Sequence, residues 1–183
     1  MDLGITLTPT TEEDGPALRA LHSEPAVAQW WDLPEPGFPM HDEPESTRLT
    51  IRCGDEIVGL VQYGEENEPK YRCASMDIFL GPAFHRRGIG TRAIQMVQDV
   101  LFAERGHHRI TIDPAAHNRA AVRCYEKAGF QRVGILRLAE RDSDGDGWHD
   151  ALMMELVLDP STAGANVPWS HRRVGRADVP HAE

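Results

Sequence analysis

Two glycines, Gly88 and Gly90, stand where the sequence predicts that a strand ends and a helix begins. The strand side is the apolar segment Met76–Leu80, and the residues after the glycines repeat apolar side chains at helical spacing. Because glycine has no Cβ, the backbone at such a junction can approach a ligand closely. The first turn of a helix offers free N–H groups and a positive dipole end, which together bind phosphate. With Arg86 and Arg87 adding positive charge, this glycine junction predicts a phosphate site.

Two common nucleotide-binding motifs do not fit the glycine junction. A dinucleotide-binding fingerprint has a third glycine where this chain has Ala93, a replacement that the motif tolerates. That fingerprint, however, opens a first strand–helix–strand unit, whereas this junction follows predicted antiparallel hairpins. A Walker A loop needs Gly-Lys followed by Ser or Thr, which the chain lacks here.

Hydrophobic periodicity predicts one α/β domain over residues 1–159 and a flexible tail over 160–183. Antiparallel hairpins come first and strand–helix–strand crossovers follow, an order typical of a mixed sheet with helices on both faces. The proline-rich stretch 33–44 should be a long loop. We expect strands at Ile5–Pro9, Leu49–Arg52, Ile57–Tyr63, Tyr71–Leu80, Arg109–Ile112, Phe130–Leu138 and Ala151–Leu158, and helices from Thr11 to Leu21 and at Pro25–Trp31, Gly88–Glu104 and Asn118–Ala128.

The chain is acidic, with a formal net charge of −10. Between Glu35 and Asp77 ten acids face four basic residues. Such a field repels nucleic acids and anionic membranes and attracts cations, although acidic surfaces also simply favour solubility. The three cysteines are widely spaced without a CxxC, and no export signal or long apolar run is present. We therefore expect reduced cysteines and a cytoplasmic protein.

A second segment, residues 111–130, follows the next predicted strand. It contains the series Asn-x-x-Ala-x-x-x-Tyr-x-x-x-Gly-Phe over Asn118–Phe130. Together with the glycine junction, this segment resembles the GNAT acetyltransferase family, whose pyrophosphate loop reads Gln/Arg-x-x-Gly-x-Gly/Ala. The corresponding positions hold His85, Gly88 and Gly90, so the first of them departs from the family pattern.

The resemblance covers about residues 3–158 and is strongest from 76 to 134. It implies a GNAT fold and acetyl-CoA as the cosubstrate. Backbone amides at the glycine junction would hold the diphosphate, and a backbone N–H at the end of the preceding strand would stabilise the oxyanion. The implied acetyl-CoA contacts are Ile78, Phe79, Leu80, Arg86, Arg87, Gly88, Ile89, Gly90, Thr91, Asn118, Ala121 and Tyr125.

Within the family, the chain is most similar to the aminoglycoside 6′-N-acetyltransferases. The similarity lies in the tandem Trp30-Trp31, in Asp77 and Asp113 ahead of the two motifs, and around Tyr125. It implies that Asp77 and Asp113 hold ammonium groups of the drug and that Tyr125 donates a proton. Further acceptor contacts are hard to place, and the only candidates are Glu65, Glu66 and Glu68.

The chemistry of amine acetylation points to the same acids. An amine attacks a thioester only as the free base, so the enzyme must hold a cation and then remove its proton, and carboxylates serve both purposes. We expect Asp77 to be the base and Asp113 the anchor, although these roles can be exchanged, and Asp150 to face the same cation site. Since adjacent helix positions do not share a face, one of Trp30 and Trp31 should be exposed to a sugar ring.

Structural interpretations of these residues also exist. Asp113 can cap a turn before Pro114, and Tyr125 and both tryptophans can belong to the core. Cys124 can act as a nucleophile in a ping-pong route, but it lacks an evident histidine partner. The acidic stretch 142–147 starts like an EF-hand loop, yet its twelfth position is a methionine, and the nine histidines show no metal-ligand spacing.

The main functional hypothesis is therefore a monomeric or homodimeric acetyltransferase that acts on an aminoglycoside. Its first competitor is a GNAT enzyme for another amine, such as a siderophore precursor, a polyamine or a protein N-terminus. A different class is a GNAT-like binding module or a calcium-binding protein that uses residues 142–147. Tyr125 and both motif segments favour an active enzyme over a binding module.

Overall fold

A computed structural model describes residues 4–41, 45–142 and 145–158, so the predicted tail over 160–183 lies outside the described residues. The strands are β1 (Ile5–Pro9), β2 (Thr47–Cys53), β3 (Glu56–Glu66), β4 (Cys73–Leu80), β5 (Arg109–Ile112), β6 (Gln131–Arg141) and β7 (Trp148–Val157). The helices are α1 (Gly15–His22), α2 (Pro25–Trp31), α3 (Ile89–Asp99) and α4 (Arg119–Lys127), with short turns η1 (Glu12–Asp14), η2 (Pro82–Phe84) and the π-helical η3 (Val100–Glu104).

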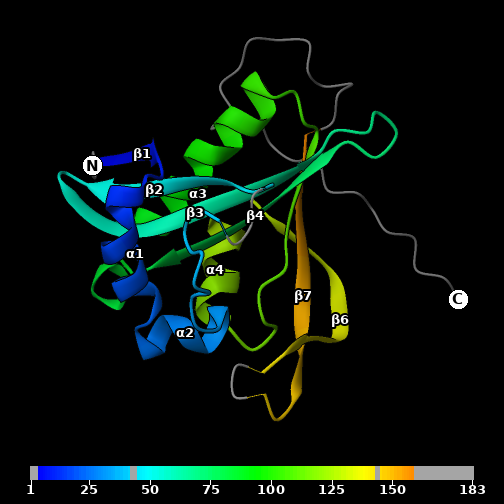
Figure 1. The fold of residues 1–183 in the computed structure, drawn as a ribbon. Helices are drawn as coiled ribbons and strands as arrows, with labels where there is room; N and C mark the ends of the chain where they lie inside the picture. The colour runs from blue at the N-terminus through cyan, green and yellow to red at the C-terminus, as the bar shows by residue number, and fades with distance from the viewer. Residues whose placement is uncertain (1–3, 42–44, 143–144, 159–183) are drawn as a thin grey trace, which may run out of the picture.

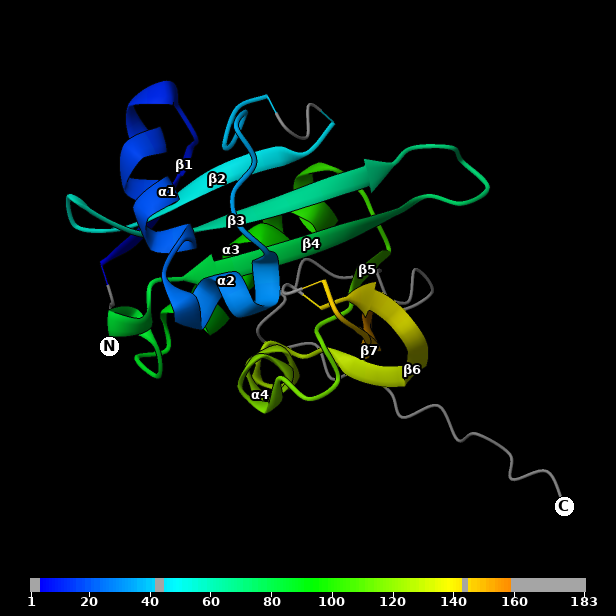
Figure 2. The same cartoon turned by 60° about the horizontal axis from the view of Figure 1, so that its bottom comes forward.

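The strands form one mixed sheet in the order β1-β2-β3-β4-β5-β7-β6. Neighbours are antiparallel except β4 and β5, which are parallel and are joined through α3. Figures 1 and 2 show α1 and α2 on one face of the sheet and α3 and α4 on the other. The predicted element order and the GNAT fold class are therefore confirmed.

Side-chain alternation along the strands builds a separate core on each face. On β3, Leu60 packs with Leu18 and Val27 of the first two helices. Its neighbour Val61 belongs to the larger cluster, which includes Val97 of α3 and other residues of α3 and α4. Both sheet faces are thus buried, which explains why β3 is almost continuously apolar.

The sheet divides between β4 and β5. These two strands share only two register pairs in the described structure, Ala74 with Ile110 and Ser75 with Thr111. Beyond these pairs the strands diverge, and in Figure 1 β2–β4 lie across the view while the antiparallel strands β6 and β7 stand vertically. The C-terminal half of β4 is therefore paired with β3 on one side only, which leaves backbone groups on the other side open to a ligand.

Two predicted element boundaries need correction. The helix expected over Gly88–Glu104 ends as an α-helix at Asp99 and continues as the π-helical turn η3, in which Arg105 N–H donates to the Val100 carbonyl. The last hairpin is longer than predicted, because Arg141 pairs with Trp148 across a register shift between Leu136 and Glu140. Cross-strand pairing, which periodicity does not report, extends both strands into the acidic turn.

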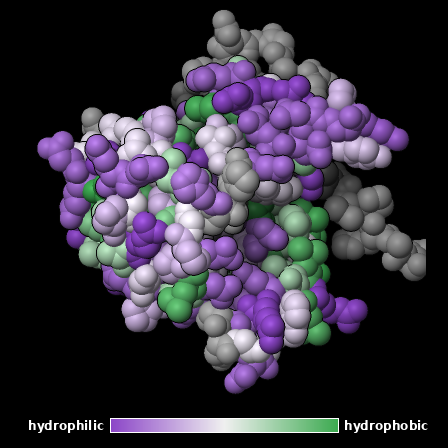
Figure 3. Space-filling model, viewed as in Figure 1, coloured by the Kyte–Doolittle hydropathy of each residue, from purple (hydrophilic) through white to green (hydrophobic). Residues whose placement is uncertain are grey.

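The edge strand β6 is exposed along its whole length. Val133, Ile135 and Leu138 are 55%, 53% and 64% exposed, and Figure 3 shows the corresponding apolar area over β6 and β7. No helix within the described ranges has the length and apolar character that crossing a bilayer requires.

Candidate active site

The glycine junction folds into a tight turn that presents the N-terminus of α3. Gly88 is the N-cap and adopts a left-handed conformation with φ of 83°, and Arg86 is also left-handed with φ of 60°. Glycine takes this conformation without a steric penalty, which explains its presence at position 88. His85 supports the turn through a 2.9 Å hydrogen bond between its Nε2 and the Leu80 carbonyl oxygen.

The first turn of α3 fits a phosphate group. No side chain caps the helix, and among the described residues no acceptor is found for the N–H groups of Ile89, Gly90 and Thr91. A Cβ on Gly90 would lie 3.4 Å from both Cys124 Sγ and Leu80 Cδ1, at the short end of van der Waals contact, so α3 packs closely against α4 and β4 here. Free donors at the positive end of a helix are suited to bind a phosphate group, as the sequence predicts for this junction.

Asp77 and Asp113 flank the point where the sheet divides. Asp77 lies three residues beyond the paired Ala74 on β4, and Asp113 lies three residues beyond the paired Ile110 of β5. Because the paired residues are buried on the α3 side, strand alternation directs both acids toward the α1 side, where both are exposed. Two acids far apart in the sequence thus lie equally far beyond the last paired residues, Asp77 within β4 and Asp113 directly after β5.

Tyr125 of α4 lies within the electrostatic influence of both acids. Burial is the largest cause that raises the pKa of its phenol, and the charges of Asp77, Cys124 and Asp113 raise this pKa further. Its ring packs 6.2 Å from the Phe130 ring. The buried-core interpretation of Tyr125 and the proton-donor interpretation are therefore compatible, since the ring is packed while the hydroxyl stays protonated near two carboxylates.

Cys124 is a poor nucleophile in this position. Burial raises the pKa of its thiol, and this effect outweighs the hydrogen bond from Thr91 and the charge of Lys127, which lower it. A thiol with a raised pKa is rarely a thiolate at neutral pH. The geometry thus disfavours the ping-pong route.

The remaining predicted acetyl-CoA contacts lie on β4 and at the start of α4. Ile78, Phe79 and Leu80 pair with β3 and lie along the open side of β4. Asn118 caps α4, because its side-chain oxygen accepts a 3.1 Å hydrogen bond from the Ala121 N–H. Its amide nitrogen is the part of the side chain left for another contact.

The two tryptophans of α2 have different surroundings. The Trp31 ring packs 5.1 Å from the Phe79 ring and 5.6 Å from the His22 ring, so it belongs to the core beneath α1 and α2. The half-buried Trp30 instead contacts the His117 ring at 5.0 Å. Of the two, only Trp30 reaches the segment that follows Asp113.

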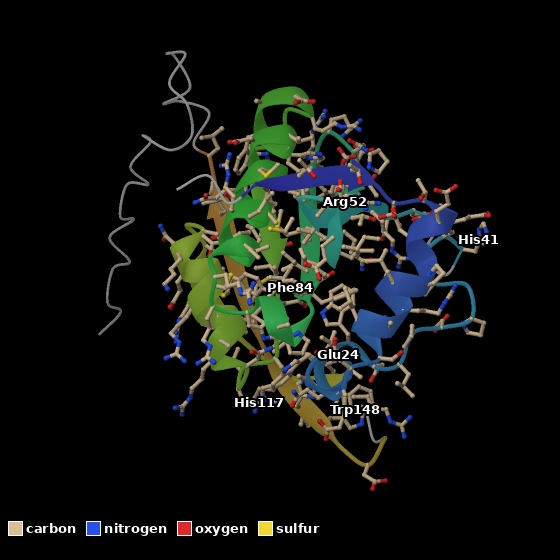
Figure 4. The ribbon with its side chains drawn as sticks, turned by 90° about the vertical axis from the view of Figure 1, so that its left-hand side faces the viewer. Glu24, His41, Arg52, Phe84, His117 and Trp148 are labelled. Carbon is tan, nitrogen blue, oxygen red and sulfur yellow. The ribbon has the colours of Figure 1, made fainter. Side chains whose placement is uncertain are left out.

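An open hollow lies beside Trp30 and His117. It is lined by Ala116, His117, Arg119, Trp148 and Asp150, and Figure 4 shows His117 and Trp148 at one end of the molecule. The carboxylate of Asp150 accepts a 2.8 Å hydrogen bond from the Leu138 N–H, which holds it in place. The sequence pointed to Asp150 but not to His117 or Trp148, because their proximity arises only when α2, α4 and β7 pack together.

Of the acids on the β3–β4 hairpin, Glu65 is on the opposite side of the sheet from Asp77. Glu65 accepts a 2.8 Å hydrogen bond from the buried His107, and strand alternation places it on the α3 face with Tyr63. Glu66 accepts a hydrogen bond from the Glu68 N–H within the turn itself. In the described part of the chain, no cluster of three or more His, Cys, Asp or Glu side chains is arranged to hold a metal ion.

Comparison with known proteins adds to this geometry. Residues 10–130 match the acetyltransferase (GNAT) family. The chain is 29% identical over 155 residues to aminoglycoside N(6′)-acetyltransferase type 1 of Klebsiella pneumoniae, a match that covers 72% of this chain and 76% of that protein. It is 27% identical over 142 residues to spermidine N(1)-acetyltransferase of Escherichia coli K12, covering 72% and 75% respectively.

Solved structures agree on the fold. The crystal structure of spermidine N-acetyltransferase from Vibrio cholerae in complex with CoA and spermine is similar with a TM-score of 0.73 at 21% identity. The match covers 84% of this chain and 95% of that one. The uncapped N-terminus of α3, the divided sheet and the matched residues lead to one conclusion. This chain belongs to the GNAT acetyltransferase family and is an N-acetyltransferase that transfers an acetyl group from acetyl-CoA to an amine.

Proposed function

We propose that the acceptor is an aminoglycoside and that its 6′-amine is acetylated, which would give resistance to the antibiotic. The observation that carries this proposal is the pair of exposed carboxylates, Asp77 and Asp113, at the division of the sheet beside Tyr125. A polycationic amine has the complementary charge. The aromatic groups Trp30, His117 and Trp148 supply flat surfaces that suit the rings of an amino sugar.

The reaction assigns a separate task to each group. Asp77 accepts the proton of the acceptor ammonium, and Asp113 holds a neighbouring ammonium group. The freed amine attacks the thioester carbon, forming the C–N bond while a backbone N–H of Ile78–Leu80 stabilises the oxyanion. The C–S bond then breaks, and Tyr125 gives its proton to the departing thiolate. The acetylated nitrogen loses its remaining extra proton to solvent, and the Tyr125 phenolate takes a proton back from solvent, which completes the cycle.

The acid strength of Tyr125 depends on the acceptor in this scheme. The charges of Asp77 and Asp113 both raise its pKa, and a bound ammonium group neutralises part of that charge. Burial still raises the pKa, so the phenol remains a weak acid. Acceptor binding therefore lowers the pKa of Tyr125 toward the pKa of the CoA thiol that forms when the thiolate is protonated.

A polyamine is the second candidate acceptor. It is favoured by the 27% identity to spermidine N(1)-acetyltransferase, which is close to the 29% identity to the aminoglycoside enzyme. A linear polyamine needs carboxylates but has no ring to stack on Trp30. Thiol release from acetyl-CoA, measured with kanamycin, tobramycin, spermidine and a peptide as competing acceptors, separates the candidates. Turnover with spermidine alone would reject the aminoglycoside proposal.

The Asp113→Asn variant tests the anchor role. We expect the KM for kanamycin to rise about five-fold, because an exposed carboxylate–ammonium contact is worth up to about 1 kcal/mol. The KM for acetyl-CoA should not change. The measurement is steady-state thiol release, and an increase confined to the acetyl-CoA KM would reassign Asp113 to the cosubstrate site.

The Gly88→Ala variant tests the diphosphate site. A Cβ in the left-handed conformation costs about 1–2 kcal/mol, so the backbone at position 88 should shift to another conformation. The N–H groups at the start of α3 would then be misplaced, and acetyl-CoA binding should weaken about 10-fold. Gly106→Ala is the matched control, because Gly106 is also left-handed, with φ of 71°, and its Cβ would meet no atom within 4 Å. Calorimetry should detect weaker binding in the first variant alone, whereas equal weakening in both would indicate a general loss of stability.

We also expect the enzyme to work in the cytoplasm, where acetyl-CoA is made, as a monomer or a homodimer. In a homodimer, we expect the second copy to pack on β6, because contact there would bury the exposed apolar side chains of this strand.

A further inference from the structure

A histidine that the proposed reaction does not use, His149, contacts His117 in the wall of the hollow beside Trp30. His149 of β7 contacts two carboxylates, with Nδ1 2.8 Å from Asp142 Oδ1 and Nε2 3.0 Å from Glu140 Oε2. A carboxylate accepts hydrogen bonds, so both ring nitrogens must donate. Only the charged imidazolium has two N–H donors, and this geometry therefore describes a protonated His149.

The charged ring of His149 supports the wall of the hollow. Its ring lies 5.3 Å from the His117 ring at an interplanar angle of 88°, an edge-to-face arrangement. The His117 ring in turn lies 5.0 Å from the Trp30 ring. The three rings thus form a continuous row from the β6–β7 hairpin to α2, and its middle member, His117, lines the hollow.

The hollow is within reach of the reacting groups. Ala116, which lines it, is three residues after Asp113, so their Cα atoms are at most about 11 Å apart at the length of an extended chain. The main chain between them is fixed, because Ala116 N–H donates to the Asp150 carbonyl and Leu152 N–H donates to the Pro114 carbonyl. One acceptor molecule of two or three rings can therefore contact both places.

We propose that this hollow binds a sugar ring of the acceptor distant from the reacting amine, and that protonated His149 is a positioning residue that fixes the His117 ring for stacking. The inference rests on the proposed aminoglycoside function, because a linear polyamine has no ring to use the surface. His149 does not touch the reacting atoms. It acts by holding His117, and through it Trp30, in one orientation.

The surrounding charges determine the pH range in which this support operates. Partial burial by itself lowers the pKa of His149, but the hydrogen bonds and charges of Glu140 and Asp142 outweigh it, so the pKa is raised above its ordinary value. Support from the imidazolium is therefore complete below the ordinary histidine pKa and is lost as the pH rises through the raised value. The other charged or titratable groups around the hairpin and hollow are His117, Arg119, Arg141, Asp146 and Asp150.

The test compares wild type with His149→Gln over a range of pH. At pH 6 we expect the variant to have about a 10-fold higher KM for kanamycin, corresponding to about 1.4 kcal/mol. Its kcat and its KM for acetyl-CoA should be nearly unchanged. The ratio of the two kanamycin KM values should fall toward one as the pH rises through the pKa of His149 in the wild type, which NMR titration of the imidazole measures directly. Both enzymes are assayed with the same acceptor, so the effect of kanamycin ionisation on KM cancels in this ratio.

Two further variants separate positioning from simple loss of stability. Glu140→Gln removes one of the two negative charges beside His149. The pH at which the KM ratio is halfway through its fall, and the pKa of His149 measured by NMR, should therefore both move to lower values. His108→Gln changes an exposed histidine that follows the buried His107. This control variant should leave kcat, both KM values and the pKa of His149 unchanged. A ratio that stays constant with pH would overturn the positioning role. If kanamycin is not acetylated at all, the proposed function fails first, whereas the NMR titration still reports whether His149 is charged.

Discussion

The Tyr125→Phe variant is expected to lower kcat by about 100-fold, the lower end of what a positioned proton donor contributes. The substitution removes only the hydroxyl, while the ring keeps its packing against Phe130. Acetyl-CoA should therefore bind with unchanged affinity. Single-turnover thiol release, together with calorimetric titration of acetyl-CoA, measures the two quantities separately.

Tyr63→Phe is the matched control for this experiment. Tyr63 is a buried tyrosine of β3 in the same hydrophobic cluster as Tyr125, and no contact with the acids at the division of the sheet is found for it. Its loss of a hydroxyl should change kcat less than two-fold. If Tyr125→Phe also retained full turnover, the thiolate would have to take its proton from solvent or from the acceptor ammonium.

The Asp77→Asn variant is expected to lower kcat/KM for the acceptor by about 100- to 1000-fold, because it removes a general base. The amide keeps the shape of the side chain but cannot accept the proton. Initial rates with kanamycin as the varied acceptor measure this loss.

Asp113→Asn and Asp99→Asn distinguish the base from its neighbours. Asp113 has the corresponding position directly after β5, so a base role there would produce the larger loss of kcat in Asp113→Asn and only a KM effect in Asp77→Asn. Asp99 is an exposed acid at the end of α3 and should tolerate the change. Equal and small effects for all three variants would mean that a water molecule accepts the proton without a carboxylate.

Much of the fold follows from local patterns. The glycine junction, the apolar periodicity of the following helix and the Asn118 cap each depend on residues within one or two turns of chain. Such signals survive in sequence because they act on the local backbone before any tertiary contact forms. Element order then restricts the topology, since crossovers between parallel strands are right-handed and short.

Long-range pairing was harder to predict. The extension of β6 to Arg141 depends on its pairing with Trp148, which lies on another strand. Likewise, Trp30 and Trp31 are identical in type and adjacent in sequence. Trp30 contacts the His117 ring whereas Trp31 packs on Phe79, and this difference depends on residues that come from other elements.

The sequence by itself determined the phosphate-binding junction, the two motifs of a GNAT enzyme and the acids suited to a cationic acceptor, because each depends on residue type and local spacing. Only the tertiary structure decided that β4 and β5 separate after two residue pairs and that Asp77 and Asp113, beyond that point, both act electrostatically on Tyr125. It also decided that His149, His117 and Trp30 form one row. The physical reason is that divergence of strands and contact between rings depend on how distant segments pack, and no local pattern carries that information.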